Sequence, residues 1–124
     1  MVDRYCTVLL VDNEEMILDF GGRIIQRLGH RVLTAPSCEL AYRIAEENGE
    51  AIDLVILDYC NAASNGEKVL KRFKEVNDDL KIMITSGYCE FAPVSSLLKE
   101  QGFDFIQKPF TAAELTDKVN WMLS

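Results

Sequence analysis

The chain has 124 residues, of which 48% are hydrophobic and 27% are charged, and its formal net charge is −7. This length and composition are typical of one compact soluble domain, residues 1–124, and they exclude a disordered chain. Because an acidic surface repels nucleic-acid phosphates and anionic lipids, direct binding to nucleic acid or to a membrane is not expected.

The remaining bulk features favour a cytoplasmic protein with reduced thiols. No apolar stretch approaches the roughly 20 residues that a membrane span needs, and nothing near the start resembles a secretory signal. A structural zinc site has almost no support, because the only histidine is His30 and no two cysteines form a C-x-x-C pair. The four cysteines are Cys6, Cys38, Cys60 and Cys89.

Short apolar runs and helical patterns alternate along the first part of the chain. Residues 7–11 predict a buried strand, since both of its faces are apolar. The next apolar residues recur at helical spacing and predict a helix that stops at Gly29. The face that this helix is expected to bury consists of Met16, Ile17, Phe20, Ile24 and Leu28. The Gly21–Gly22 pair weakens the helix by roughly 1 kcal/mol for each glycine.

The next two elements follow the same alternation. Residues 31–34 predict a short strand, and the Pro36–Ser37 pair is expected to open a second helix. The apolar residues of that helix are Leu40, Ala41, Ile44 and Ala45.

The second half continues with three more strands. Residues 53–57 predict a buried strand that ends in Asp58, and strands are also expected at 80–85 and 103–107. Helical patterns follow Asn65–Gly66, span residues 91–98 and close the chain. The last helix is expected to begin with a capping box formed by Thr111 and Glu114, and to bury Leu115, Val119 and Met122.

Five strands that are each followed by a helix predict a doubly wound parallel sheet with helices on both faces, the flavodoxin-like (βα)5 architecture. In such sheets, ligands bind beyond the carboxyl ends of the strands. Four strand ends here carry polar residues that suit phosphate chemistry, which is the strongest functional signal in the sequence. These residues are Asp12, Asp58, Thr85 and Lys108.

The four side chains together can form an acyl phosphate. Asp58 can attack phosphorus as a nucleophile, and the acidic loop at Asp12 can hold Mg²⁺. Thr85 can donate a hydrogen bond to a phosphoryl oxygen, and Lys108 can supply a compact positive charge. Each residue alone is usually a loop carboxylate, a helix cap or a solvated lysine, but four of them at four separate strand ends make that explanation improbable.

Four segments resemble the signature blocks of response-regulator receiver domains: residues 9–14, 53–58, 84–88 and 108–110. The resemblance covers essentially the whole chain. It implies that Asp58 takes a phosphoryl group from the phosphohistidine of a histidine kinase or phosphotransfer domain, with Mg²⁺ required. It also implies that Thr85 and Lys108 read the phosphoryl group. The metal ligands that it implies are Asp12, Asn13, Asp58 and the backbone carbonyl of Cys60.

The resemblance further implies a switch rather than a turnover enzyme, with autophosphorylation and autodephosphorylation as its only intrinsic activity. Phe105 falls at the position of the family's switch aromatic, which turns inward when Thr85 moves. The face built from residues 91–98, Phe105 and the last helix would then contact an output domain, an effector or a second copy. Residues 86–88 and 105–110 are also similar to receivers at the ends of hybrid histidine kinases.

Two departures from the family pattern leave an alternative open. Asn13 stands where a second acid is usual, so weaker Mg²⁺ binding is expected, and Ala62 replaces a usual proline. A degenerate receiver that acts as a phosphorylation-independent interaction module is favoured by Asn13 and opposed by the intact Asp58, Thr85 and Lys108. A flavin or nucleotide binder is opposed because no G-x-G-x-x-G or Walker loop follows the first strand.

Four further residues receive simpler interpretations. His30 is expected to be a loop or surface residue, and Cys60 and Cys89 are expected to be inert fillers. Trp121 is expected to belong to a partner surface or to pack at the edge of the last helix.

Overall fold

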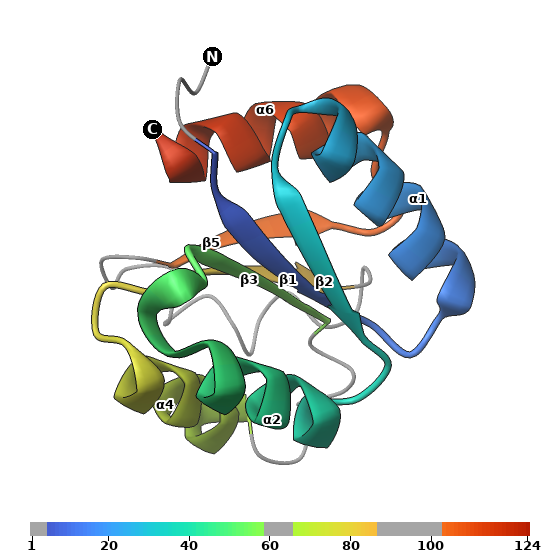
Figure 1. Cartoon of the computed structure of the whole chain (residues 1–124). Coiled ribbons are helices and arrows are strands. Elements are labelled where there is room, and N and C mark those ends of the chain that lie inside the picture. Colours follow the sequence, from blue (N-terminus) through green and yellow to red (C-terminus); the bar gives the residue numbers. More distant parts are fainter. Residues whose placement is uncertain (1–4, 59–65, 87–102) are drawn as a thin grey trace.

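The structure of the chain, a computed structural model, describes residues 5–58, 66–86 and 103–124 (Figure 1). Its strands are β1 (Thr7–Val11), β2 (Arg31–Ala35), β3 (Leu54–Asp58), β4 (Lys81–Ser86) and β5 (Phe103–Gln107). Its helices are α1 (Glu15–Arg27), α2 (Cys38–Asn48), the short 3-10 helix η1 (Gly49–Ala51), α4 (Gly66–Val76) and α6 (Ala112–Leu123). Every predicted strand is confirmed to within one residue at either end, whereas the helix predicted at 91–98 lies outside the described residues.

The five strands form one parallel sheet in the order β2-β1-β3-β4-β5. This order is the flavodoxin-like one, and it reverses direction between β1 and β3. Helices α1 and α6 lie together on one face of the sheet, and α2 and α4 lie on the other (Figure 1). The predicted doubly wound architecture is therefore confirmed.

Two hydrophobic clusters, one on each face of the sheet, form the core. Along β1, Leu9 and Val11 pack into the cluster beneath α2 and α4, while Val8 and Leu10 pack beneath α1 and α6. Strands β1 and β3 are buried along their whole length, which explains why their sequences are apolar on both faces. Both strands end at the same edge of the sheet, where they bring Asp12 and Asp58 to neighbouring positions.

The predicted helix boundaries are confirmed at three places. The Ser37 hydroxyl accepts a hydrogen bond from the amide of Leu40 and caps α2. Thr111 and Glu114 form the reciprocal capping box of α6, with distances of 3.1 and 3.0 Å. Gly29 follows α1 with φ of 93°, a conformation that favours glycine over residues with a Cβ.

The predicted buried face of α1 is wrong at its first turns. Met16 is 82% exposed and Phe20 is 42% exposed, whereas Gly21 and Ile25 are buried. A Cβ atom at Gly21 would lie only 3.0 Å from Leu10 Cδ2, so the absent side chain allows the helix to approach the sheet closely. Periodicity that scores only large apolar residues misses this rotation, because the residue that faces the sheet is a glycine. Leu40, one of the apolar residues of α2, is 39% exposed.

His30 lies in the loop between α1 and β2, as expected, but it is buried, with 4% of its surface exposed, so its alternative assignment as a surface residue is wrong. Its Nδ1 accepts a hydrogen bond of 3.1 Å from the amide of Cys6, and the amide of Arg31 donates to the Cys6 carbonyl at 2.9 Å. The imidazole is tolerated inside because it satisfies a backbone donor. His30 therefore joins the turn after α1 to the beginning of β1.

We expect His30→Leu to lower the free energy of unfolding by about 1–3 kcal/mol, because leucine fills the space without accepting the Cys6 amide. His30→Asn keeps an acceptor near the position of Nδ1 and should lose less stability despite its smaller volume. Urea unfolding followed by circular dichroism would measure both. A His30→Leu protein as stable as the wild type would show that the hydrogen bond between the Cys6 amide and His30 does not stabilise the fold.

Candidate functional site

Four strand ends deliver the predicted site residues to the carboxyl edge of the sheet. Asp12 directly follows β1, Asp58 is the last residue of β3, and Lys108 directly follows β5. Thr85 lies near the end of β4 and is the register partner of Asp58. The two aspartates thus come from β1 and β3, the pair of strands between which the strand order reverses.

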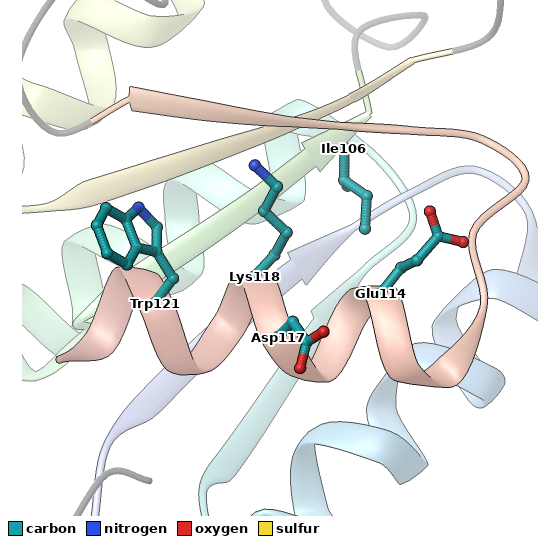
Figure 2. A pocket seen from close by; sticks show the side chains of 5 residues that line it. All are labelled: Ile106, Glu114, Asp117, Lys118 and Trp121. Atoms are coloured by element: carbon teal, nitrogen blue, oxygen red, sulfur yellow. The ribbon is translucent and has the colours of Figure 1, made fainter.

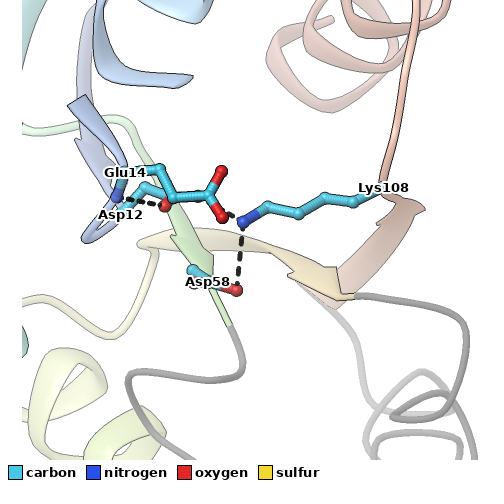
Figure 3. Close-up of polar contacts among 4 residues, drawn as sticks. All are labelled: Asp12, Glu14, Asp58 and Lys108. Atoms are coloured by element: carbon cyan, nitrogen blue, oxygen red, sulfur yellow. Dashed lines mark hydrogen bonds and ion pairs between the residues drawn. The ribbon is translucent and has the colours of Figure 1, made fainter. Parts of the chain in front are cut away.

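Lys108 bridges the two aspartates (Figure 3). Its Nζ lies 2.6 Å from Asp12 Oδ2 and 3.4 Å from Asp58 Oδ1. The side chains of Asp12 and Asp58 are 1% and 2% exposed, and that of Lys108 is 17% exposed. Charges this well buried are weakly screened, so the ammonium offsets repulsion between two carboxylates that the fold holds side by side.

The orientation of Asp12 is fixed from the other side by the backbone. The amide of Glu14 donates a hydrogen bond of 2.8 Å to Asp12 Oδ1 (Figure 3). Glu14 in turn is the N-cap residue of α1, and its carbonyl accepts the amides of Ile17 and Leu18. One carboxylate oxygen of Asp12 therefore faces the start of α1, and the other faces Lys108.

The charge of Lys108 is stabilised by its surroundings. Burial by itself would lower the pKa of this lysine, but the hydrogen bond with Asp12 and the negative charges of Asp58, Asp12 and Glu14 outweigh burial. The pKa of Lys108 is consequently raised above its ordinary value. The site thus contains a permanent cation at neutral pH.

Thr85 is the neighbour of Asp58 on the adjacent strand and carries a buried hydroxyl. The residue is 2% exposed, and its Oγ1 has no hydrogen-bond partner among the residues that the structure describes. Buried hydroxyls are nearly always hydrogen-bonded, so one without a partner needs an explanation. Its place next to Asp58 in the sheet register makes the hydroxyl available to a group attached to that carboxylate.

Sequence reasoning missed Cys38, the first residue of α2. Burial raises the pKa of its thiol, and the negative charge of Asp58 raises it further. The signal that could have found Cys38 is its position just after β2, at the same edge of the sheet. A raised pKa favours the protonated thiol, which is a poor nucleophile, so Cys38 is a neighbour of the site rather than a reactive group.

The other predicted residues are placed as follows. Asn13 is exposed on the loop between β1 and α1, beside Asp12. Phe105 is half-buried on β5 and packs against the cluster beneath α2 and α4. Cys60, the predicted carbonyl ligand, lies outside the described residues, as do Ala62 and Cys89.

The donor set fits Mg²⁺ better than it fits a transition metal. In the described parts of the chain, no group of three or more His, Cys, Asp and Glu side chains could hold a metal ion. Mg²⁺ is usually held by one or two carboxylates together with phosphate oxygens and waters, and it does not need a cage made only of protein side chains. Asp12 and Asp58 supply two such carboxylates at one edge.

Two shallow grooves flank Trp121, and neither is lined by Asp12, Asp58, Thr85 or Lys108. The first, of about 400 Å³, is lined by Ile106, Glu114, Asp117, Lys118 and Trp121 (Figure 2). The second, of about 380 Å³, extends from Trp121 toward Lys81 and Phe103 at the opposite end of the strands. Trp121 is 73% exposed, so it lies on the surface and does not pack into the core. No helix in the described residues is long and apolar enough to cross a membrane.

Comparison with known proteins gives relatives that share this arrangement of elements. The chain is 34% identical over 117 residues to the sensor kinase CckA of Brucella abortus, covering 94% of this chain and 12% of CckA. It is 28% identical to the DNA-binding transcriptional regulator NtrC of Azospirillum brasilense, covering 95% of this chain and 24% of NtrC. The chain therefore spans only a small part of these two relatives.

Two solved structures match this chain over nearly their full length. A response regulator receiver domain protein from Clostridium thermocellum superposes with a TM-score of 0.85 at 29% identity, covering 95% of this chain and 94% of that one. The receiver domain of the hybrid histidine kinase CckA superposes with a TM-score of 0.78 at 27% identity, covering 95% and 99%. Residues 8–120 match the family described as the response regulator receiver domain. With its fold, its strand-end aspartates and this match in agreement, the chain belongs to the response regulator receiver domain family.

Proposed function

We propose that the chain is a phosphorylation-dependent signalling switch in which Asp58 accepts a phosphoryl group. The donor is the phosphohistidine of a histidine kinase or phosphotransfer domain. The observation that carries this proposal is the environment of Asp58. Its buried carboxylate lies 3.4 Å from the Lys108 ammonium. Its register partner on β4 is Thr85, whose hydroxyl has no hydrogen-bond partner among the described residues.

The transfer forms one bond and breaks another. An oxygen of Asp58 attacks phosphorus, the phosphorus–nitrogen bond of the donor breaks, and the electron pair stays on the imidazole nitrogen. The product is an acyl phosphate on Asp58. Lys108 pairs with the new phosphoryl oxygens, and Thr85 donates its hydroxyl hydrogen to one of them. Asp12, Asn13, Asp58 and the carbonyl of Cys60 would hold Mg²⁺, which neutralises charge on the transferred group.

The conformational signal follows from the position of Thr85. Its movement toward the phosphoryl group shifts the end of β4, whose residues Ile84 and Thr85 pair with Phe105 and Ile106 of β5. Phe105 then turns inward, and the face that includes β5 and α6 changes its affinity for an output domain, an effector or a second copy. Hydrolysis of the acyl phosphate by the domain itself ends the signal. We place this switch in the cytoplasm.

The relatives indicate two contexts for such a switch. One is named a sensor kinase and another a DNA-binding transcriptional regulator, and the chain covers 12% and 24% of them. The output of this chain is accordingly set by what it contacts or is joined to. The acidic chain itself, with a net charge of −7, is not proposed to bind nucleic acid directly.

A second candidate function is a phosphorylation-independent interaction module. The observation that favours it is Asn13, an exposed neutral residue beside Asp12 where the family usually has a second acid. Loss of that charge weakens the expected hold on Mg²⁺. The module would use the same fold and the same partner surfaces but would never carry a phosphoryl group.

Intact mass spectrometry after incubation with Mg²⁺ and acetyl phosphate separates the two candidates. We expect the wild-type chain to gain one phosphoryl group only when Mg²⁺ is present, and Asp58→Ala to gain none. Asp78→Ala, an exposed aspartate between α4 and β4, is the matched control and should behave like the wild type. If the wild type gains nothing and beryllofluoride leaves its amide spectrum unchanged, the switch is refuted and the interaction module is the better description.

A further inference from the structure

An aspartate on β5 joins the backbone of Phe105 to the last helix. Asp104 Oδ1 accepts a hydrogen bond of 2.7 Å from the amide of Phe105, and the same oxygen lies 3.0 Å from Lys118 Nζ. Because the acceptor is a carboxylate, both contacts are charge-assisted hydrogen bonds. A displacement of the Phe105 backbone would therefore move the group that Lys118 binds.

The two ends of this contact lie on opposite faces of the sheet. The side chain of Phe105 packs against the cluster beneath α2 and α4, whereas that of Ile106 packs into the cluster beneath α1 and α6. Side chains alternate along a strand, so Asp104 is on the same face of β5 as Ile106. Figure 2 shows Lys118 extending from α6 toward β5, where it meets Asp104. The Asp104–Lys118 ion pair thus connects Phe105 to a face of the sheet that its own ring does not reach.

The ion pair adjoins the two grooves beside Trp121. Lys118 lines the first groove, Asp104 lines the second, and Trp121 lines both. The surface around the exposed indole consequently depends on where the Lys118 side chain is held.

The ion pair is not what keeps α6 on the sheet. The side chains of Lys118 and Asp104 are 39% and 22% exposed, and ion pairs this open to water are screened and contribute little to stability. The helix is anchored by its buried apolar residues, which are Leu115, Val119, Met122 and Leu123. The pair can therefore be made or broken at little cost to the fold, and what it sets is the shape of the surface.

We propose that Asp104 and Lys118 are positioning residues that carry the movement of Phe105 to the surface around Trp121. The inference rests on the proposed function, and it names the contact by which the switch would reach α6. When the backbone of Phe105 moves with the end of β4, its amide draws the Asp104 carboxylate with it. The Lys118 ammonium follows the carboxylate, and the grooves on the two sides of Trp121 change shape together.

Beryllofluoride in the presence of Mg²⁺ tests this link, because Trp121 is the only tryptophan of the chain and its indole signal is a single reporter on α6. In the wild type, we expect the amides of Phe105 and Ile106 and the indole of Trp121 to shift. In Lys118→Met and in Asp104→Asn, the two amides should still shift, while the indole shift should fall at least about threefold. Asp104→Asn retains an oxygen for the Phe105 amide, so it removes the ion pair alone.

Two further variants serve as controls. Asp19→Asn removes an exposed ion pair of 3.1 Å with Arg23 that lies within α1 and joins no two elements, and it should respond as the wild type does. Lys118→Arg keeps a positive charge and should retain the indole shift. If folded Lys118→Met and Asp104→Asn both keep the wild-type indole shift, the inference is overturned. It is also overturned if these variants lose the shifts on β5, since the defect would then precede the ion pair.

A measurement without any phosphodonor separates this inference from the proposed function. Phe105→Leu disturbs β5 directly, and we expect it to move the Trp121 indole signal in the wild-type background but not in Lys118→Met. If acetyl phosphate adds nothing to Asp58 while this dependence on Lys118 is observed, the link stands and the phosphoryl switch does not. If Asp58 is phosphorylated but Phe105→Leu moves the indole signal equally in both backgrounds, the switch stands and the link does not.

Discussion

Thr85→Val is expected to produce a protein that is more stable than the wild type and that no longer responds to phosphorylation. The Thr85 hydroxyl is buried without a hydrogen-bond partner among the described residues, so it carries a desolvation cost in the unmodified state. Valine has nearly the same shape without that cost, and we expect a gain of about 1–2 kcal/mol in the free energy of unfolding. The same change removes the group that would contact the phosphoryl oxygen.

Two measurements are needed, because the substitution is expected to raise the free energy of unfolding and to abolish the response to phosphorylation. Urea unfolding would give the stability, with Thr34→Val on the exposed surface of β2 as a control that should change by less than about 0.5 kcal/mol. Amide spectra with beryllofluoride would give the response, which should vanish at Phe105 and Ile106 in Thr85→Val while Asp58 still gains mass from acetyl phosphate. A destabilised Thr85→Val with a normal response at β5 would contradict both expectations.

Phe73→Ala is expected to cause the largest loss of stability, about 3–5 kcal/mol. Phe73 of α4 is fully buried, and its ring packs against that of Tyr42 on α2 with centroids 4.7 Å apart. Truncation leaves a cavity in the cluster that joins α2 and α4 to the sheet. A loss of this size is comparable to the whole stability of many small domains, so we expect partial unfolding at 37 °C.

Trp121→Ala is the matched control, because it truncates an even larger aromatic side chain that is 73% exposed. It should change the free energy of unfolding by less than about 0.5 kcal/mol. Thermal and urea unfolding of both variants would give the comparison. If the two substitutions lowered the free energy of unfolding by the same amount, burial of Phe73 would not account for its expected contribution to stability.

The fold was predictable because the strands carry a strong local signal. Strands β1 and β3 are apolar on both faces, which only a strand covered on both sides requires, and each is followed by a helical pattern. The start of α6 was predictable from the capping box of Thr111 and Glu114, because its hydrogen bonds join residues only three positions apart. Local rules succeeded wherever the determining partner lay within a few positions along the chain.

Burial was harder to predict where the determining partner was distant. Gly21 faces the sheet because of Leu10, and His30 is buried because it accepts the amide of Cys6. Neither partner is identifiable from periodicity. The apolar pattern alone therefore predicted, wrongly, that Met16 and Phe20 face the core. Tertiary contact overrode local pattern at each of these positions.

The location of the candidate site followed from one topological rule, since the carboxyl ends of parallel strands meet at one edge. That rule places backbones, so it brought Asp12, Asp58, Thr85 and Lys108 to the same edge. It does not place the end of a long flexible side chain. The 2.6 Å contact between Lys108 and Asp12 was therefore visible only in the structure.

The dispersal of the site along the chain has a consequence for biosynthesis. Its residues run from Asp12, after the first strand, to Lys108, after the last, and they meet only when all the parallel pairings between them have formed. Such long-range pairings close late, and no partial chain leaving the ribosome can assemble the four groups. A nascent or truncated chain that stops before Lys108 would be unable to intercept phosphoryl groups meant for the finished protein.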